Sequence, residues 1–190
     1  MSEMILAIAA FLFIPTACYY LVKKSDRRIY SGKDIIWIVT FAYLWSFLNI
    51  FIHEFGHALT ARGFGYVASK ISVGVGWKLF SFGGGEYTEM TFQIFPVFGY
   101  THAKMGNAGQ EIIVLAMGVI TQFLFLGLVY WLLKRNKKWQ ETLIGYFCYH
   151  YAIKTAFWLT FVLNFPFVLS GSDWTRIVIL IRDLLKDSNF

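Results

Sequence analysis

Charged residues are scarce in this chain of 190 residues: Asp, Glu, Lys and Arg together make up only 15% of it. Hydrophobic residues make up 57% and aromatic residues 20%, which is far from the usual balance of a soluble domain. This composition predicts an integral membrane protein. Once the membrane-crossing segments are subtracted, the length leaves no room for a soluble accessory domain, so we expect one integral membrane domain over residues 1–190.

Cysteine is also scarce, since the chain has only Cys18 and Cys148, each inside an apolar run. These positions argue against a disulfide framework and against a zinc site built from cysteines. No Lys or Arg precedes the first apolar stretch, residues 4–22, and a basic segment follows it, which is the reverse of a cleavable signal peptide. We therefore expect this stretch to be retained as a span.

The net charge of +6 does not indicate a nucleic-acid partner. Nine of the 17 Lys and Arg residues lie in two short loops, residues 23–34 and 134–140, directly beside apolar stretches. Anionic lipid and membrane topology explain basic residues in such places. We therefore expect the lipid bilayer as a partner and no nucleic acid.

Four apolar stretches are long enough to cross a hydrocarbon core of roughly 30 Å as helices that rise about 1.5 Å per residue. Because successive spans alternate in direction, the two basic loops lie on one face of the membrane. The second and fourth spans both run away from that face, so their far ends reach the same depth. We expect an all-α, multi-pass protein of the cell membrane with spans at residues 4–22, 35–59, 112–133 and 142–163.

The segment between the second and third spans is more than a loop. Apolar residues alternate over residues 71–79 and again over 90–94, with glycines at 83–85 marking a turn between them. This pattern predicts a membrane-associated β-hairpin that dips into the bilayer, with residues 90–96 as its free edge. Beyond the fourth span, residues 174–185 mix apolar and charged side chains at helical spacing and predict a short C-terminal helix.

Residues 53–57 read His-Glu-Phe-Gly-His and lie near the far end of the second span. Positions four apart share one helix face, so His53 and His57 can both point an imidazole at one metal ion, with Glu54 beside it as a general base. A zinc hydrolase needs one more protein ligand and an open position for water. Ionisable groups inside a membrane are costly and usually functional, which favours a metal site over a polar core.

The third ligand has to come from another part of the chain. His150 lies early in the fourth span, far in depth from His53, whereas Asp173 follows the far end of that span, on the same face as the histidines. In isolation, a role of Asp173 with Ser172 in capping the helix that follows would be favoured over metal binding. The candidates are His102, His150, Asp173, Glu86, Glu89 and Glu111.

Three segments between residues 50 and 174 match one known pattern: FIHEFGHALTARGFG, IFPVFGYTHAKMG and NFPFVLSGSD. In them the chain resembles the site-2 proteases, a family of intramembrane zinc metalloproteases. The resemblance implies that Asp173 completes a site for one Zn2+ ion and that Asn164 contacts the substrate backbone or the developing oxyanion. It also implies cleavage of transmembrane or membrane-associated protein substrates, with Glu54 accepting a proton from the attacking water.

The chain departs from the pattern of that family at several positions. Phe98 and Trp174 stand where the pattern has Gly, and Val119 and Gln122 replace the Pro and Asn of a Gly-Pro-x-x-Asn motif. These departures leave an alternative function, a catalytically inactive membrane scaffold or chaperone that retains the fold. A further alternative is a membrane zinc protease of another fold, with Glu111 as its third ligand.

The resemblance also suggests how the single domain is organised. Residues 1–34 are expected to form an N-terminal span and basic loop, 35–174 the catalytic core, and 175–190 the C-terminal helix. Because no room remains for a fused regulatory module, we expect a separate membrane protein that regulates the enzyme or presents its substrate. Basic loops usually lie on the cytoplasmic side of a membrane, which would put the histidines near the outer face. The resemblance instead implies a metal site closer to the cytoplasm.

Overall fold

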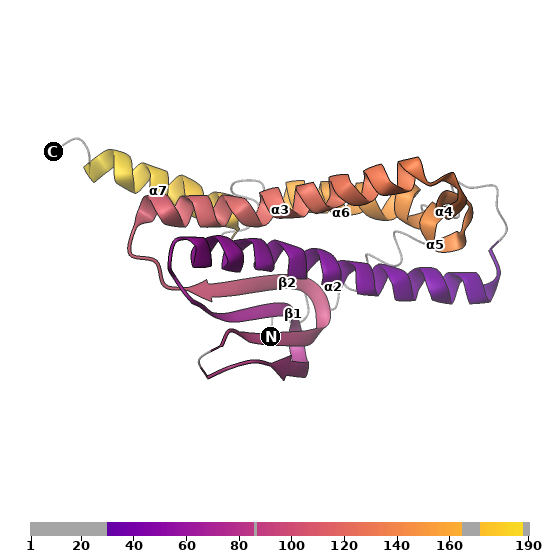
Figure 1. The fold of residues 1–190 in the computed structure, drawn as a ribbon, viewed down its shortest axis with the longest axis horizontal. Coiled ribbons are helices and arrows are strands. Elements are labelled where there is room, and N and C mark those ends of the chain that lie inside the picture. The colour runs from indigo at the N-terminus through magenta and orange to yellow at the C-terminus, as the bar shows by residue number, and fades with distance from the viewer. Residues whose placement is uncertain (1–29, 86, 165–171, 188–190) are drawn as a thin grey trace.

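The computed structural model describes residues 30–85, 87–164 and 172–187. In this part of the chain most residues are helical, and one β-hairpin interrupts the helices (Figure 1). The predicted first span, residues 4–22, lies outside the described residues. In chain order the elements are α2 (Gly32–Gly63), β1 (Ala68–Phe82), β2 (Glu89–Ala103), α3 (Ala108–Arg135), α4 (Lys137–Glu141), α5 (Leu143–Phe147), the π-helical turn η1 (Cys148–Ala152), α6 (Ile153–Asn164) and α7 (Asp173–Asp187).

Two of the described helices, α2 and α3, are long and apolar enough to cross a membrane. Ser31 begins α2 with a capping box, in which its hydroxyl accepts from the backbone N–H of Asp34 and the Asp34 carboxylate accepts from the Ser31 N–H. The side chain of Asn107 caps α3 by accepting from the backbone N–H of Gln110. These helices contain the predicted second and third spans.

The predicted fourth span, residues 142–163, is helical but is not one regular helix. It consists of α5, η1 and α6, which follow one another without a gap. A π-helical turn changes which side chains face a neighbouring helix. The apolar side chains before and after this turn therefore do not lie on one continuous helix face. Phe147 and Cys148, at the start of this turn, are buried in one cluster with Trp45 of α2 and Leu126 of α3.

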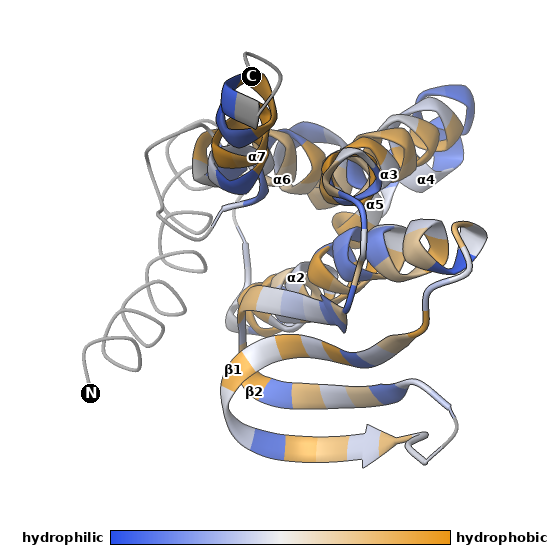
Figure 2. Cartoon of the chain, turned by 90° about the vertical axis from the view of Figure 1, so that its left-hand side faces the viewer, coloured by the Kyte–Doolittle hydropathy of each residue, from blue (hydrophilic) through white to orange (hydrophobic). Residues whose placement is uncertain are grey.

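The helices and the hairpin form layers with α2 in the middle. The helices α3 and α6 lie along one side of α2 and the hairpin along the other, with hydrophobic residues on all of them (Figure 2). The contact between α2 and α3 is close at Gly56, where a Cβ atom would lie 2.8 Å from the carbonyl oxygen of Met117. This close approach brings the face of α2 that carries the histidines against α3.

The two strands pair antiparallel, but they bend so that the first half of β1 has neighbours on both sides. Ile71, for example, pairs with both Thr101 and Met90. Gly74 and Gly76 permit the bend in β1, because their φ angles of 91° and 94° are ones that other residues rarely adopt. The hairpin is therefore a folded sheet and not a flat ribbon.

The predicted free edge at residues 90–96 is wrong in its first part. Thr91 pairs with Ser72 on one side and with Ser81 on the other, so this part of β2 lies inside the sheet. Within the described register, residues 99–103 pair on one side only, with the first half of β1. The end of β2 is therefore an edge of the sheet, because the bend places its beginning between two stretches of β1.

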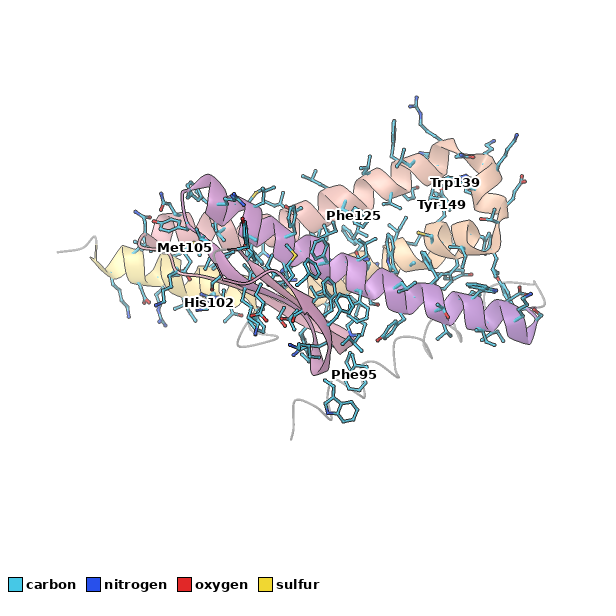
Figure 3. The ribbon with its side chains drawn as sticks, turned by 60° about the horizontal axis from the view of Figure 1, so that its bottom comes forward. Phe95, His102, Met105, Phe125, Trp139 and Tyr149 are labelled. Atoms are coloured by element: carbon cyan, nitrogen blue, oxygen red, sulfur yellow. The ribbon has the colours of Figure 1, made fainter. Side chains whose placement is uncertain are left out.

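The hairpin runs along the apolar part of α2. The hydroxyl of Tyr43 in α2 donates to the carbonyl oxygen of Ile94 at a distance of 2.6 Å. Figure 3 shows the sheet lying along α2, with Phe95 near one end and His102 toward the other. Tyr43 precedes His53 by ten residues, so the hairpin extends about 15 Å along the helix from the level of that histidine.

The predicted C-terminal helix is present as α7, and it lies beside the beginning of α3. Ser172 caps it, since its Oγ accepts from the backbone N–H of Thr175 at 3.4 Å, and Asp173 is the first helical residue. Arg176 forms an ion pair with Glu111 at the start of α3, with 2.6 Å between Nη2 and Oε1. The carboxylate of Asp173 is therefore not the cap of α7 and is directed elsewhere.

Candidate metal centre

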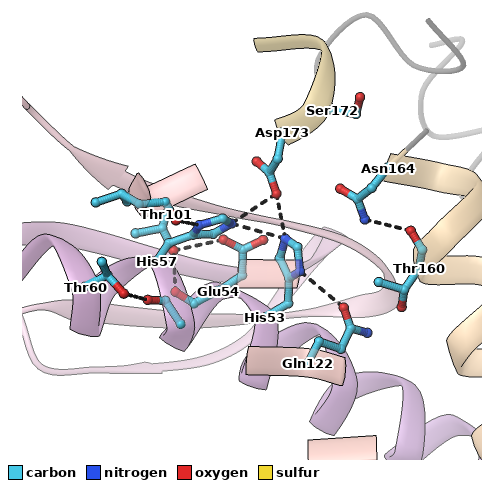
Figure 4. A network of polar contacts seen from close by, with 12 residues as sticks. His53, Glu54, His57, Thr60, Thr101, Gln122, Thr160, Asn164, Ser172 and Asp173 are labelled. Atoms are coloured by element: carbon cyan, nitrogen blue, oxygen red, sulfur yellow. Dashed lines mark hydrogen bonds and ion pairs between the residues drawn. The ribbon is translucent and has the colours of Figure 1, made fainter. Parts of the chain in front are cut away.

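Three side chains from two helices meet at one point between α2, α3 and α7 (Figure 4). His53 and His57 lie one turn apart on α2, and their Nε2 atoms are 3.1 Å from each other. Asp173, 120 residues after His53, places its Oδ2 2.9 Å from the Nε2 of His53 and 3.2 Å from the Nε2 of His57. The structure thus brings together the three residues that the sequence proposed as metal ligands.

The other nitrogen of each imidazole is bonded to α3. His57 Nδ1 lies 2.7 Å from the carbonyl oxygen of Val114, which can only accept, so this nitrogen carries the proton. His53 Nδ1 lies 3.2 Å from Oε1 of Gln122 and donates to it in the same way. With both protons on Nδ1, each Nε2 presents its lone pair to the other histidine and to Asp173. Such partners orient metal-binding histidines.

Three electron-pair donors this close together repel one another unless a cation lies among them. An ion just outside the plane of a triangle with edges of 2.9, 3.1 and 3.2 Å lies about 2 Å from each corner, the distance at which zinc binds imidazole and carboxylate. Two nitrogens and one oxygen also leave a fourth tetrahedral position open. The donor set and its spacing therefore fit a zinc ion.

The carboxyl of Asp173 is ionised, as a ligand has to be. Burial by itself would raise its pKa, but the hydrogen bonds from His53 and His57 outweigh burial and hold the pKa well below its usual range. In the absence of a metal ion, each of these bonds requires a second proton on its imidazole, at Nε2. A metal ion and these protons therefore compete for the same place.

Glu54 lies beside the metal site but faces the hairpin. The residue is only 4% exposed, and its Oε2 accepts a hydrogen bond of 2.8 Å from the hydroxyl of Thr101 in β2. Gly99, two residues earlier in the same strand, leaves room for it, since a Cβ atom there would lie 2.7 Å from Glu54 Oε1. Glu54 is thus outside the set of three ligand atoms and next to it, as a general base requires.

Gly118 of α3 provides the space for the imidazole of His57. A Cβ atom at this position would overlap Cε1 and Nε2 of that ring. The obstacle would be the imidazole of His57, which cannot move away without leaving the candidate ligand cluster. The position of the His57 imidazole therefore depends on the absence of a side chain at Gly118 in the neighbouring helix.

Replacing Gly118 by alanine is expected to prevent metal binding, although alanine favours a helix by about 1 kcal/mol over glycine. Gly127→Ala, in the same helix, is a matched control, because a Cβ atom there would meet nothing within 4 Å. Metal content of the two purified variants, measured by mass spectrometry, should be near zero for the first and normal for the second. Normal metal content in Gly118→Ala would show that His57 is not held in this place.

The other predicted ligand candidates lie elsewhere. Glu111 is occupied by its ion pair with Arg176, and His102 Nδ1 lies 2.8 Å from the hydroxyl of Ser69 in the hairpin. The ring of His150 packs on another aromatic ring, Tyr146, with 4.3 Å between the ring centroids. Oε2 of Glu89 lies 3.9 Å from Nζ of Lys70, and Glu86 is outside the described residues.

Asn164 is not part of the ligand cluster. It is the last residue of α6, and its Nδ2 donates to the carbonyl oxygen of Thr160 at 3.0 Å. Figure 4 shows its side chain on the same side of the site as Asp173. Its proposed contact with a substrate stays a prediction.

Four residues of the site were not recognised as such in the sequence. Gln122 appeared there only as a departure from a motif, yet it holds His53, and its position as a polar residue in an apolar helix was the available signal. Thr101 and Gly99 gave a weaker signal, the alternation by which they share one face of a strand. The role of Val114 gave no signal in the sequence, because it uses the backbone carbonyl group that every residue has.

Sequence comparison identifies what the chain is similar to. The model of the family described as Peptidase family M50 matches residues 41–179, which is most of the chain. The matched region begins within the first half of α2, ends in α7 and includes His53, Glu54, His57 and Asp173.

Relatives from bacteria match over shorter stretches. The probable protease eep of Enterococcus faecalis is 29% identical over 82 residues, 43% of this chain and 19% of the relative. The regulator of sigma-W protease RasP of Bacillus subtilis is 32% identical over 97 residues, 51% and 21% of the two chains. A putative zinc metalloprotease of Thermotoga maritima is 40% identical over 63 residues, 33% and 12%. Each match thus covers about a fifth of the relative or less.

Proposed function

The chain belongs to peptidase family M50, and from this we propose that it is an intramembrane zinc endopeptidase that cleaves transmembrane or membrane-associated proteins. The observation that carries the proposal is the cluster of two imidazole nitrogens and one carboxylate oxygen, all within 3.2 Å of one another, with the Glu54 carboxylate beside it. The relatives named as zinc metalloproteases support the choice of metal.

In this proposal each side chain has one task. His53, His57 and Asp173 hold one zinc ion, which would polarise the scissile carbonyl and make a water molecule more acidic. Glu54 accepts the proton of the attacking water and delivers it to the leaving amine. Asn164, at the end of α6, contacts the substrate backbone or the developing oxyanion.

The sheet edge next to Glu54 offers a place for the substrate. A peptide bond within a helix is shielded, so the substrate has to unwind locally before it can be cut. An extended segment can then add as a strand to residues 99–103, since main-chain hydrogen bonds along an edge bind peptides of many sequences. This edge touches Glu54 through Thr101, which would bring the bound peptide to the base.

The surroundings of the site follow from the same proposal. The chain crosses the cell membrane four times, with residues 4–22 and the stretch from α5 to α6 in addition to α2 and α3. The hairpin dips into the bilayer beside α2, in keeping with its exposed Trp77 and Tyr87. All residues then belong to one membrane domain, and a separate membrane protein regulates it or presents its substrate.

The rival function is a membrane scaffold or chaperone that keeps the fold without catalysis. It rested on the altered Gly-Pro-x-x-Asn motif, in which Val119 and Gln122 replace Pro and Asn. Gln122, however, bonds to Nδ1 of His53, and the Gly of the motif, Gly118, makes room for His57. These contacts favour a functional site over a decayed one.

Cleavage of a transmembrane peptide by the purified protein in detergent tests the proposal. We expect fragments to appear with the wild-type chain, to disappear after treatment with a zinc chelator, and to return when zinc is added. His53→Ala serves as the inactive control, because zinc cannot rescue a site that lacks a ligand. Cleavage that persists in the chelator, or fragments from His53→Ala, would contradict a zinc mechanism.

A further inference from the structure

The base Glu54 faces a different neighbour from the metal ligands that flank it. Successive helical residues are turned by about 100°, so when His53 points toward α3 and α7, Glu54 points toward the hairpin. In the described part of the chain, the hydroxyl of Thr101 is the one hydrogen-bond partner of its carboxylate. A carboxylate that is buried this deeply depends on such a partner for its position.

The hairpin holds this hydroxyl in a fixed place. Thr101 is paired with Ile71, which is 1% exposed and has neighbours on both sides in the sheet. Gly99, on the same face of the strand, fits closely against Glu54 Oε1, whereas Tyr100 between them points outward and is 51% exposed. The strand thus contacts both oxygens of the carboxylate, with a hydrogen bond on one and close packing on the other.

Two roles are open to the Thr101 hydroxyl. It lies 2.8 Å from Glu54 Oε2 and 2.9 Å from the backbone oxygen of Glu54, and it has only one proton to donate. A bond to the backbone oxygen would merely fasten the hairpin to α2. A bond to the carboxylate is the stronger one because its acceptor carries a charge, and it fixes the side chain.

We propose that Thr101 is a positioning residue, which holds the carboxylate of Glu54 in its reactive orientation and links it to the strand edge that receives the substrate. The inference rests on the proposed function and adds to it a residue that acts through the base. Substrate strand, sheet edge and base are then one connected unit. Orientation of a catalytic group is worth a large part of its effect on the rate.

Three variants separate the positioning role from a structural one. Thr101→Val keeps the shape of the side chain and removes the hydroxyl, whereas Thr101→Ser keeps the hydroxyl. Thr91→Val is the matched control, since Thr91 lies on the same strand, is 4% exposed and directs its hydroxyl to Glu89 at 3.2 Å. The measurements are kcat and KM for a transmembrane peptide, zinc content and the melting temperature.

We expect kcat of Thr101→Val to fall about 10- to 100-fold, as for loss of a hydrogen bond to a charged group, with KM and zinc content unchanged. Thr101→Ser should recover kcat to within a few-fold, and Thr91→Val should behave as the wild type. An unchanged kcat in Thr101→Val would overturn the proposal. So would a joint loss of kcat, zinc and melting temperature that serine does not restore.

An infrared measurement tests the contact without reference to activity. The carboxylate band of Glu54 is identified from the difference between the wild type and Glu54→Gln. We expect this band to shift in Thr101→Val and to return in Thr101→Ser. A band that stays in place would overturn the inference even if the chain is a protease, whereas a shift in a protein that cleaves nothing would locate the failure in the proposed function.

Discussion

Asp173→Ala is expected to purify without its metal ion, whereas Glu111→Ala is expected to retain it. Asp173 supplies the oxygen that lies 2.9 and 3.2 Å from the two histidine nitrogens, while Glu111 is bonded to Arg176. Loss of a residue that only supports a ligand costs about 10- to 100-fold in metal affinity, so loss of the ligand itself should exceed this range. Metal content by mass spectrometry, with a zinc titration of each variant, measures the difference.

The two acidic residues also differ in what their loss should do to the fold. Glu111→Ala removes a partner of Arg176 at the protein surface, where such ion pairs contribute about 1 kcal/mol or less. Its melting temperature should therefore stay close to that of the wild type. If Glu111→Ala lost the metal while Asp173→Ala kept it, the alternative with a glutamate as third ligand would be correct.

Glu54→Gln is expected to keep its zinc and to lose cleavage. Glutamine has the shape of glutamate, and its amide oxygen can still accept from the Thr101 hydroxyl, so the site should remain assembled. It cannot take the proton of water, and a general base contributes about 100- to 10,000-fold to a rate. Cleavage of a transmembrane peptide, measured beside metal content, tests both halves.

The control for Glu54→Gln is His53→Ala, which should lose metal and cleavage together. Together the two variants distinguish loss of metal binding from loss of proton transfer from the attacking water. Undiminished cleavage by Glu54→Gln with full metal content would rule out Glu54 as the base.

The three candidate metal ligands could be predicted from helix spacing, from the expected depth of the spans and from the resemblance to the site-2 proteases. His53 and His57 share a face through their spacing of four, which is a property of any α-helix. The expected alternation of the spans placed Asp173 at their depth, but its choice among six candidates came from the resemblance to the site-2 proteases. The structure brings these three residues together, with their candidate ligand atoms within 3.2 Å of one another, and metal binding by them stays a prediction.

The surroundings of the ligands were harder to predict because they depend on how elements pack. Gln122 looked like a lost motif residue, and its bond to His53 becomes visible only when α2 and α3 are side by side. Alternation along β2 gave the strand, but the bend at Gly74 and Gly76 decides which part is the edge. The π-helical turn between α5 and α6 likewise could not be recognised from the hydropathy pattern of the sequence.

The most direct test of the metal centre is diffraction by crystals of the purified protein on both sides of the zinc absorption edge. We predict one anomalous peak, within bonding distance of Nε2 of His53, Nε2 of His57 and a carboxylate oxygen of Asp173. A peak bound to Glu54 or Glu111, or no peak at these three residues in a protein that cleaves its substrate, would contradict the account.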